Sequence, residues 1–294
     1  MQLTRRATIV AIGTALMAVV LMPAVRDLVR LMDQNLLGER LKDSLAFVHG
    51  QEDWGDAARL ERKQDYRWRQ SVNGPLLIAH ALGEAKFATA NTVGALRRSE
   101  VKGFRVFESD FWLQSGAVRC YHGPEDPPPL QPGDCRFENV LDALPPGAWL
   151  VLDIKTDFQT TAMEILKIAQ EKGRLSRLVF QLYAPKQVSL FNGWQKEYPE
   201  IPGPIITVYL SHRAVSHIAA HAKRVGVEVL TVPLARVPAY RTRPDHLALL
   251  VHPVHDCSAS EQALTNGAAG LYALNSLDCL QLKNLEMGAR ERAD

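Results

Sequence analysis

The chain has 294 residues, of which 47% are hydrophobic, so it can bury a large core. This length fits one domain of about 250 residues with a shorter appendage. The formal net charge is only +2 and no basic block stands out beyond the N-terminal region, so the composition gives no support for nucleic-acid binding.

The first 25 residues are predicted to form a membrane anchor. Arg5 and Arg6 precede an uncharged, mostly apolar run, Ala7–Val25, which is close to the ~20 residues that span a bilayer. Basic residues on this side predict a cytoplasmic N-terminus and a domain in the periplasm or outside the cell. A cleavable signal peptide is the alternative, although Met22-Pro23-Ala24 is a poor cleavage site.

Residues 26–71 are predicted to form a juxtamembrane amphipathic segment. Leucines recur at near-helical spacing between Leu28 and Leu45, which predicts a helix that lies on the membrane or packs under the following domain. Trp54, Tyr66 and Trp68 could anchor at the membrane interface or cover the bottom of that domain.

The candidate site begins with two predicted strands. The apolar run Leu76–Ala79 is typical of a buried parallel strand, so His80 stands at the C-terminal end of that strand. A second strand, Arg105–Leu113, carries Glu108 and Asp110 two positions apart. Side chains alternate between the faces of a strand, so these two carboxylates point the same way.

A divalent cation would relieve the cost of burying Glu108 beside Asp110, because like charges oppose each other's ionisation. Oxygen ligands favour a hard ion such as Mg²⁺ or Ca²⁺. His80 and His122 then remain for proton transfer. The alternative is two solvated acids on an exposed strand, against which the apolar flanking residues argue.

The rest of the chain alternates between predicted strands and helices. A third strand, Ala148–Lys155, ends with Asp153 and Lys155 on one face, where a structural ion pair between them is one possibility. Five more strands are predicted at 178–183, 204–210, 228–233, 246–254 and 270–274. Eight strands that alternate with helices predict a (β/α)8 TIM barrel over residues 72–294, with its site at the C-terminal ends of the strands.

The four cysteines are candidates for disulfide bonds, because an even number fits an exported domain. Cys120 and Cys135 bracket a loop rich in proline and glycine, and a bond between them would hold His122 in place. Two unpaired buried thiols are the alternative. Cys257 and Cys279 flank the last helix and strand and form a second candidate pair.

The pattern resembles that of the glycerophosphodiester phosphodiesterases and the related sphingomyelinase D-type phospholipases. In that family a strand ends in His-Arg-Gly, Glu-Asn-Thr opens a helix, Glu-x-Asp lies on the next strand and a second His follows. The matching residues here are His80, Asn91-Thr92, Glu108, Asp110 and His122. The order and the spacings agree, so the resemblance implies a phosphodiesterase on a TIM barrel.

Three positions depart from the family's pattern. Ala81 replaces the Arg, Ala90 replaces the Glu, and Gly123 replaces an Asp that often follows the second His. The first change weakens the expected contact with a phosphate. A degenerate barrel that binds a lipid headgroup or a partner without doing chemistry is therefore kept as an alternative.

The resemblance also implies roles for the site residues. Glu108, Asp110 and Asp153 would hold Mg²⁺ or Ca²⁺, while His80 and His122 would divide the proton transfers. In the family the attacking group is a hydroxyl of the substrate itself, which gives a cyclic phosphate before hydrolysis.

Five further residues are candidates for contact with the substrate. Lys155 would place a point charge on a phosphate oxygen, and Asn91 belongs to the matched motif. His252 lies in Val251-His252-Pro253-Val254-His255, which is similar to the family's Val-His-Thr-Val-Asn stretch. Gln181 and Tyr183 lie two apart near a strand end, where they would donate hydrogen bonds to the substrate or simply pack.

The expected activity is hydrolysis of glycerophosphodiesters or phospholipid headgroups. Within the enzyme class, the alternative is a phospholipase D-like enzyme that acts on intact membrane lipids. The predicted anchor and the loop after His122 favour this version, because both suit a substrate embedded in a bilayer. The expected partners are therefore a phosphodiester or phospholipid-derived substrate and the membrane.

Overall fold

The computed structural model describes residues 58–70, 74–86, 89–122, 136–208, 215–240 and 247–275. The predicted anchor at 1–25, most of the juxtamembrane segment 26–71, and Trp54 lie outside these residues. Within the described ranges, no helix is both long enough and apolar enough to cross a membrane.

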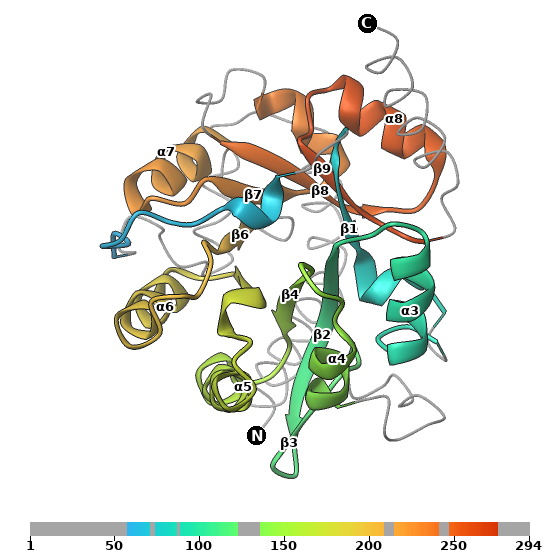
Figure 1. Cartoon of the computed structure of the whole chain (residues 1–294). Helices are drawn as coiled ribbons and strands as arrows, with labels where there is room; N and C mark the ends of the chain where they lie inside the picture. Colours follow the sequence, from blue (N-terminus) through green and yellow to red (C-terminus); the bar gives the residue numbers. More distant parts are fainter. Residues whose placement is uncertain are drawn as a thin grey trace, which may run out of the picture. The chain divides into compact units, whose positions relative to one another are not determined.

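Eight parallel strands form a closed barrel (Figure 1). Its strands are β1 (Leu76–Ala79), β2 (Val106–Gln114), β4 (Trp149–Ile154), β5 (Leu178–Leu182), β6 (Ile205–Thr207), β7 (Val229–Val232), β8 (Ala248–Val254) and β9 (Gly270–Ala273). Pairing of β1 with both β9 and β2 closes the ring. The predicted barrel is confirmed.

Helices surround the strands on the outside (Figure 1). They are α3 (Val93–Val101), α4 (Phe137–Ala143), α5 (Phe158–Glu171), α6 (Pro185–Glu197), α7 (Val215–Val225) and α8 (Cys257–Thr265). The alternation of side chains explains the two layers of the core: Leu150 and Leu152 pack in the cluster shared with the helices, whereas Val151 belongs to a separate cluster inside the barrel. Because both faces of these strands are buried, their sequences are continuous apolar runs.

The segment before β1 closes the N-terminal end of the barrel. Tyr66 and Trp68 are buried in the cluster formed by residues at the N-terminal ends of the strands. The indole nitrogen of Trp68 donates to the carbonyl of Gly203 at 3.0 Å, and the Tyr66 hydroxyl donates to the carbonyl of Pro204 at 3.2 Å. Both aromatic residues thus cover the bottom of the domain.

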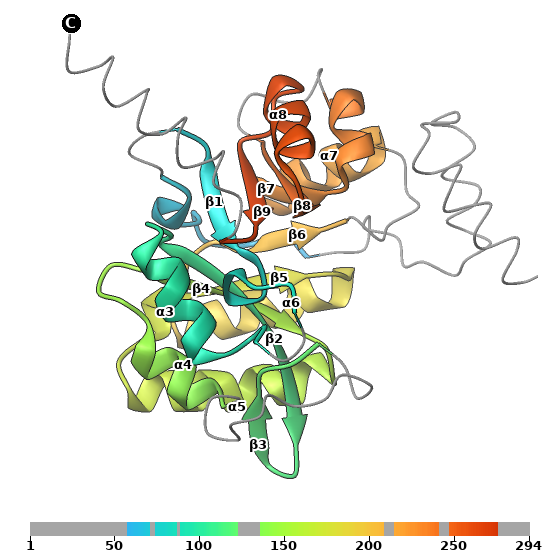
Figure 2. The ribbon, with the colours of Figure 1, turned by 90° about the vertical axis from the view of Figure 1, so that its right-hand side faces the viewer.

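Beyond the barrel, β2 continues into a hairpin with the antiparallel strand β3 (Ala117–Arg119) (Figure 2). Cys120 follows β3 and is buried, while Cys257 begins α8. No disulfide joins these two described cysteines. Cys135 and Cys279 lie outside the described residues, so the two predicted disulfides stay predictions.

Candidate functional site

A tight turn follows β1 and carries the first histidine. His80–Gly83 form a 3-10 turn in which Ala81, Leu82 and Gly83 have φ angles of 48°, 61° and 101°. Left-handed conformations at non-glycine residues cost on the order of 1–3 kcal/mol each and are found where the surrounding structure enforces them. The turn directs the backbone N–H of Ala81 at Glu108 Oε2, 2.8 Å away.

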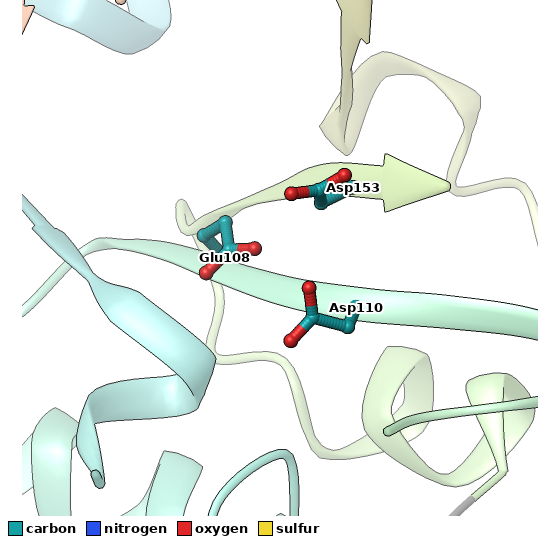
Figure 3. A group of neighbouring side chains, drawn as sticks. All are labelled: Glu108, Asp110 and Asp153. Atoms are coloured by element: carbon teal, nitrogen blue, oxygen red, sulfur yellow. The ribbon is translucent and has the colours of Figure 1, made fainter. Parts of the chain in front are cut away.

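Three carboxylates, two from β2 and one from β4, lie close together (Figure 3). Glu108, Asp110 and Asp153 are 1%, 4% and 3% exposed, and one oxygen from each lies within 4.8 Å of the others. The register between the strands places Asp110 opposite Asp153. Period-two alternation puts Glu108 on the same face as Asp110, so the three side chains point toward one another.

Asn91 fixes Asp110 from the loop before α3. Its side-chain nitrogen donates to Asp110 Oδ2 at 3.0 Å, and its oxygen accepts from the backbone N–H of Asp110 and the hydroxyl of Ser109. Thr92 caps α3 by accepting from the N–H of Ala95. The structure thus gives Asn91 a role in orienting a carboxylate, while its predicted contact with substrate stays a prediction.

Lys155 and Tyr183 bind the aspartates from the other side. Lys155 Nζ lies 3.0 Å from Asp110 Oδ1 and 2.7 Å from Asp153 Oδ2, and the Tyr183 hydroxyl donates to the latter oxygen at 2.8 Å. Asp153 Oδ1 is buried without a hydrogen-bond partner. A buried carboxylate oxygen left in this way is costly unless a further group binds it.

The electrostatics of the cluster favour a cation. Burial raises the pKa of Glu108 well above its ordinary value, and the charges of Asp110 and Asp153 raise it further. Burial likewise raises the pKa of Asp153. Because Lys155 supplies only one positive charge among three carboxylates, two negative charges remain when all are ionised. An all-oxygen donor set with this excess could hold a hard divalent ion.

The histidines gather beside the carboxylates. The ring of His80 meets that of His252 edge to face, with centroids 4.5 Å apart. Burial lowers the pKa of His80 to about 4; the charge of Asp110 opposes this shift, while the charges of His255 and His122 add to it. His122 is exposed, and its carbonyl accepts from Trp112 Nε1 at 3.0 Å. The structure therefore brings both predicted acid–base histidines to the same strand ends.

No protein-family model matches the chain. No curated protein matches it either. Solved structures do: a glycerophosphodiester phosphodiesterase from Parabacteroides distasonis is 12% identical, with a TM-score of 0.57 over 75% of this chain and all of that one. A phosphodiesterase from Oleispira antarctica, in complex with the product sn-glycerol-3-phosphate, is 15% identical, with a TM-score of 0.55 over 71% of this chain and 96% of that one.

The chain has the fold of the glycerophosphodiester phosphodiesterases. Its described residues place the acidic cluster at the C-terminal end of the barrel, where TIM-barrel enzymes build their sites. The family resemblance of the sequence is thus matched by the fold.

Within the phosphodiesterase fold, the sequence pattern did not reveal Tyr272. This residue lies on β9, is fully buried, and contacts the ring of His252 at 4.9 Å between centroids. The side-chain oxygen of Gln181 accepts hydrogen bonds from the hydroxyls of Tyr272 and Thr207, while its predicted contact with substrate stays a prediction. Local sequence carries no signal for Tyr272, because its partners are on strands far away in the chain.

Proposed function

We propose that this protein is a metal-dependent phosphodiesterase that hydrolyses glycerophosphodiesters or phospholipid headgroups. The observation that carries the proposal is the buried trio Glu108, Asp110 and Asp153 at the C-terminal end of a barrel, in which Lys155 bridges the two aspartates. Proteins of the same fold are phosphodiesterases by name, and one was solved with sn-glycerol-3-phosphate as its product. This supports a phosphodiester of glycerol as substrate.

The three carboxylates would hold Mg²⁺ or Ca²⁺, which when bound offsets the negative charge that develops on the phosphate. Asn91 and Tyr183 keep Asp110 and Asp153 oriented through their hydrogen bonds. Lys155 is the only one of these groups with a positive charge, and it donates to a phosphate oxygen. Ala81 offers the phosphate no side-chain donor, so this task falls to Lys155.

The two histidines would divide the proton transfers. A new P–O bond forms to the attacking hydroxyl, whose proton passes to one imidazole, and the bond to the leaving alkoxide breaks as the other imidazole protonates it. Burial lowers the pKa of His80 to about 4, so its ring is neutral at pH 7 and has one nitrogen that carries no proton. His122 is exposed and would be the partner that protonates the leaving alkoxide. General acid–base catalysis of this kind contributes ~10²–10⁴-fold.

The test is hydrolysis of glycerophosphocholine, which carries a hydroxyl beside its phosphodiester, by the full-length protein with Mg²⁺, Ca²⁺ or EDTA. Asp110→Asn is the matched control, since it keeps the shape of the side chain and removes its charge. We expect ion-dependent turnover that this variant lacks. A folded protein that binds the ions but hydrolyses no phosphodiester would contradict the proposal and favour a degenerate, binding-only barrel.

The substrate is then identified by comparing soluble glycerophosphocholine with vesicles of lysophosphatidylcholine. Faster hydrolysis of the former supports a glycerophosphodiesterase, whereas hydrolysis of the vesicle lipid alone supports a phospholipase D-like enzyme. We further propose that the anchor at 1–25 places the barrel outside the cytoplasm. Alkaline phosphatase fused after the barrel would be active only if the fusion is exported.

A further inference from the structure

A layer of polar side chains lies buried inside the barrel. It consists of Gln181 on β5, Thr207 on β6, Thr231 on β7 and Tyr272 on β9, each 3% exposed or less. Gln181 Oε1 accepts from the Thr207 hydroxyl at 2.9 Å and from the Tyr272 hydroxyl at 3.0 Å, and the Thr231 hydroxyl donates to Tyr272 at 3.3 Å. TIM barrels usually fill such layers with branched apolar residues.

These hydrogen bonds fix the Tyr272 ring at its tip. Two of them end on the hydroxyl, and the ring itself is fully buried. Buried hydroxyls are tolerated only when they are bonded, and a satisfied polar network favours one arrangement of its members. Tyr272 is therefore a rigid surface inside the barrel.

A line of three rings connects this surface to the site. His252 meets Tyr272 with centroids 4.9 Å apart and an interplanar angle of 83°, and it meets His80 at 4.5 Å and 84°. Both contacts are edge to face, the arrangement that aromatic rings prefer. His252 is thus held on one side by the polar layer and in turn packs against His80.

We propose that His252 is a positioning residue that holds the ring of His80 in one orientation, and that Tyr272 seats His252. The inference rests on the proposed function only in taking His80 as an acid–base group. Edge-to-face contacts of this kind can favour one ring orientation by up to about tenfold. A catalytic imidazole needs such a fixed direction, because proton transfer requires hydrogen-bond geometry.

The competing role for His252 is direct contact with the substrate. The two roles differ in what a substitution preserves. Phenylalanine at this position keeps an aromatic ring against His80 but removes both ring nitrogens, whereas alanine removes the ring as well. Positioning therefore predicts rescue by phenylalanine, and substrate contact does not.

The experiment measures kcat and KM of the full-length protein for glycerophosphocholine with Mg²⁺. For His252→Ala we expect kcat to fall about tenfold with KM unchanged, and for His252→Phe we expect most of this loss to be recovered. Tyr272→Phe removes only the hydroxyl and should lower kcat about threefold at constant KM. His221→Ala on α7 is the control. Equal losses in the alanine and phenylalanine variants, or a rise in KM in both, would overturn the proposal.

A second readout does not need turnover. In proton–nitrogen correlation spectra of the histidine rings, His80 is assigned as the signal lost in His80→Gln. We expect this signal to stay sharp in the wild-type protein and in His252→Phe and to shift and broaden in His252→Ala and, more weakly, in Tyr272→Phe. An unchanged His80 signal in both of the latter variants would refute positioning. A wild-type protein without phosphodiesterase turnover would refute the proposed function alone.

Discussion

Replacing Glu108 by glutamine would separate the charge of the acidic cluster from its shape. Burial and the two aspartates hold the pKa of Glu108 well above its ordinary value, so the ionised side chain costs stability when no cation is bound. Glutamine keeps an oxygen to accept from the N–H of Ala81 and removes the charge. We expect the ion-free Glu108→Gln protein to be at least as stable as the wild type.

The response to divalent ions should change in the opposite direction. A cation at 100 times its Kd stabilises the folded state by about 2.7 kcal/mol, which at ~2–4 °C per kcal/mol for a domain of this size raises Tm by about 5–11 °C. In the structure the cluster has two uncompensated negative charges when all its groups are ionised, which one divalent ion neutralises. If the loss of the Glu108 carboxylate weakens ion binding about a hundredfold, the ion stabilises the folded variant by only ~0.4 kcal/mol at the same concentration.

Scanning calorimetry of the wild type and of Glu108→Gln, each with EDTA and with Mg²⁺ or Ca²⁺, measures both effects. Glu100→Gln on the surface of α3 is the matched control, since it changes the same chemical group far from the barrel interior. A wild type that no divalent ion stabilises, or a Glu108→Gln protein that responds as strongly as the wild type, would refute the reasoning. So would a large loss of stability in the ion-free variant.

Three further predictions concern Lys155, Gly83 and His80. Lys155→Met should destabilise the ion-free protein by about 3–5 kcal/mol, since the two aspartates that Lys155 bridges lose their buried partner; calorimetry should also show a larger gain from divalent ions than in the wild type. Gly83→Ala should cost about 2–5 kcal/mol in urea unfolding, because φ is +101° and the new methyl group would collide with Ser99. Gly103→Ala, with φ of +91° and open space, should cost only ~1–2 kcal/mol; equal costs would argue against the collision. Burial lowers the pKa of His80 from 6.5 to about 4. The contribution of the neutral ring to the free energy of unfolding is therefore complete above pH 6.5 and is lost as pH falls toward 4. In urea unfolding, the free energy of unfolding of the wild type should fall by about 1.4 kcal/mol more than that of His80→Asn between about pH 7.5 and 5.5. An equal fall in both proteins would contradict this pKa.

The positions of the strands and the convergence of the acids could be predicted from the sequence because both are local. An apolar run bounded by turn residues indicates a buried strand, and period two places Glu108 with Asp110. That Asp153 stands opposite Asp110 depends on the register between β2 and β4, which the barrel topology constrains once eight strands are counted.

The supporting contacts could not be predicted in this way. The bond from Tyr183 to Asp153 joins residues 30 positions apart, and that from Tyr272 to Gln181 joins residues 91 apart. Such pairs depend on which inward-facing side chains share a layer of the barrel, and on how their lengths fit. The left-handed conformation of Ala81 could not be predicted from the sequence either, because alanine rarely adopts it.

The segment that covers the bottom of the barrel has a consequence for how the protein folds during synthesis. Tyr66 and Trp68 leave the ribosome before β1, yet their partners Gly203, Pro204 and Glu228 follow 135 to 162 residues later. At Gly203 any Cβ would meet the Tyr66 ring at 2.6 Å, so the seat for this ring is formed only when β6 is in place. The apolar side chains of the N-terminal segment therefore stay exposed to water until most of the barrel has formed. Partly folded chains with exposed apolar side chains are prone to aggregate. A shortened protein should keep Tyr66 and Trp68, since one that begins at β1 would fold with its lower core open to water.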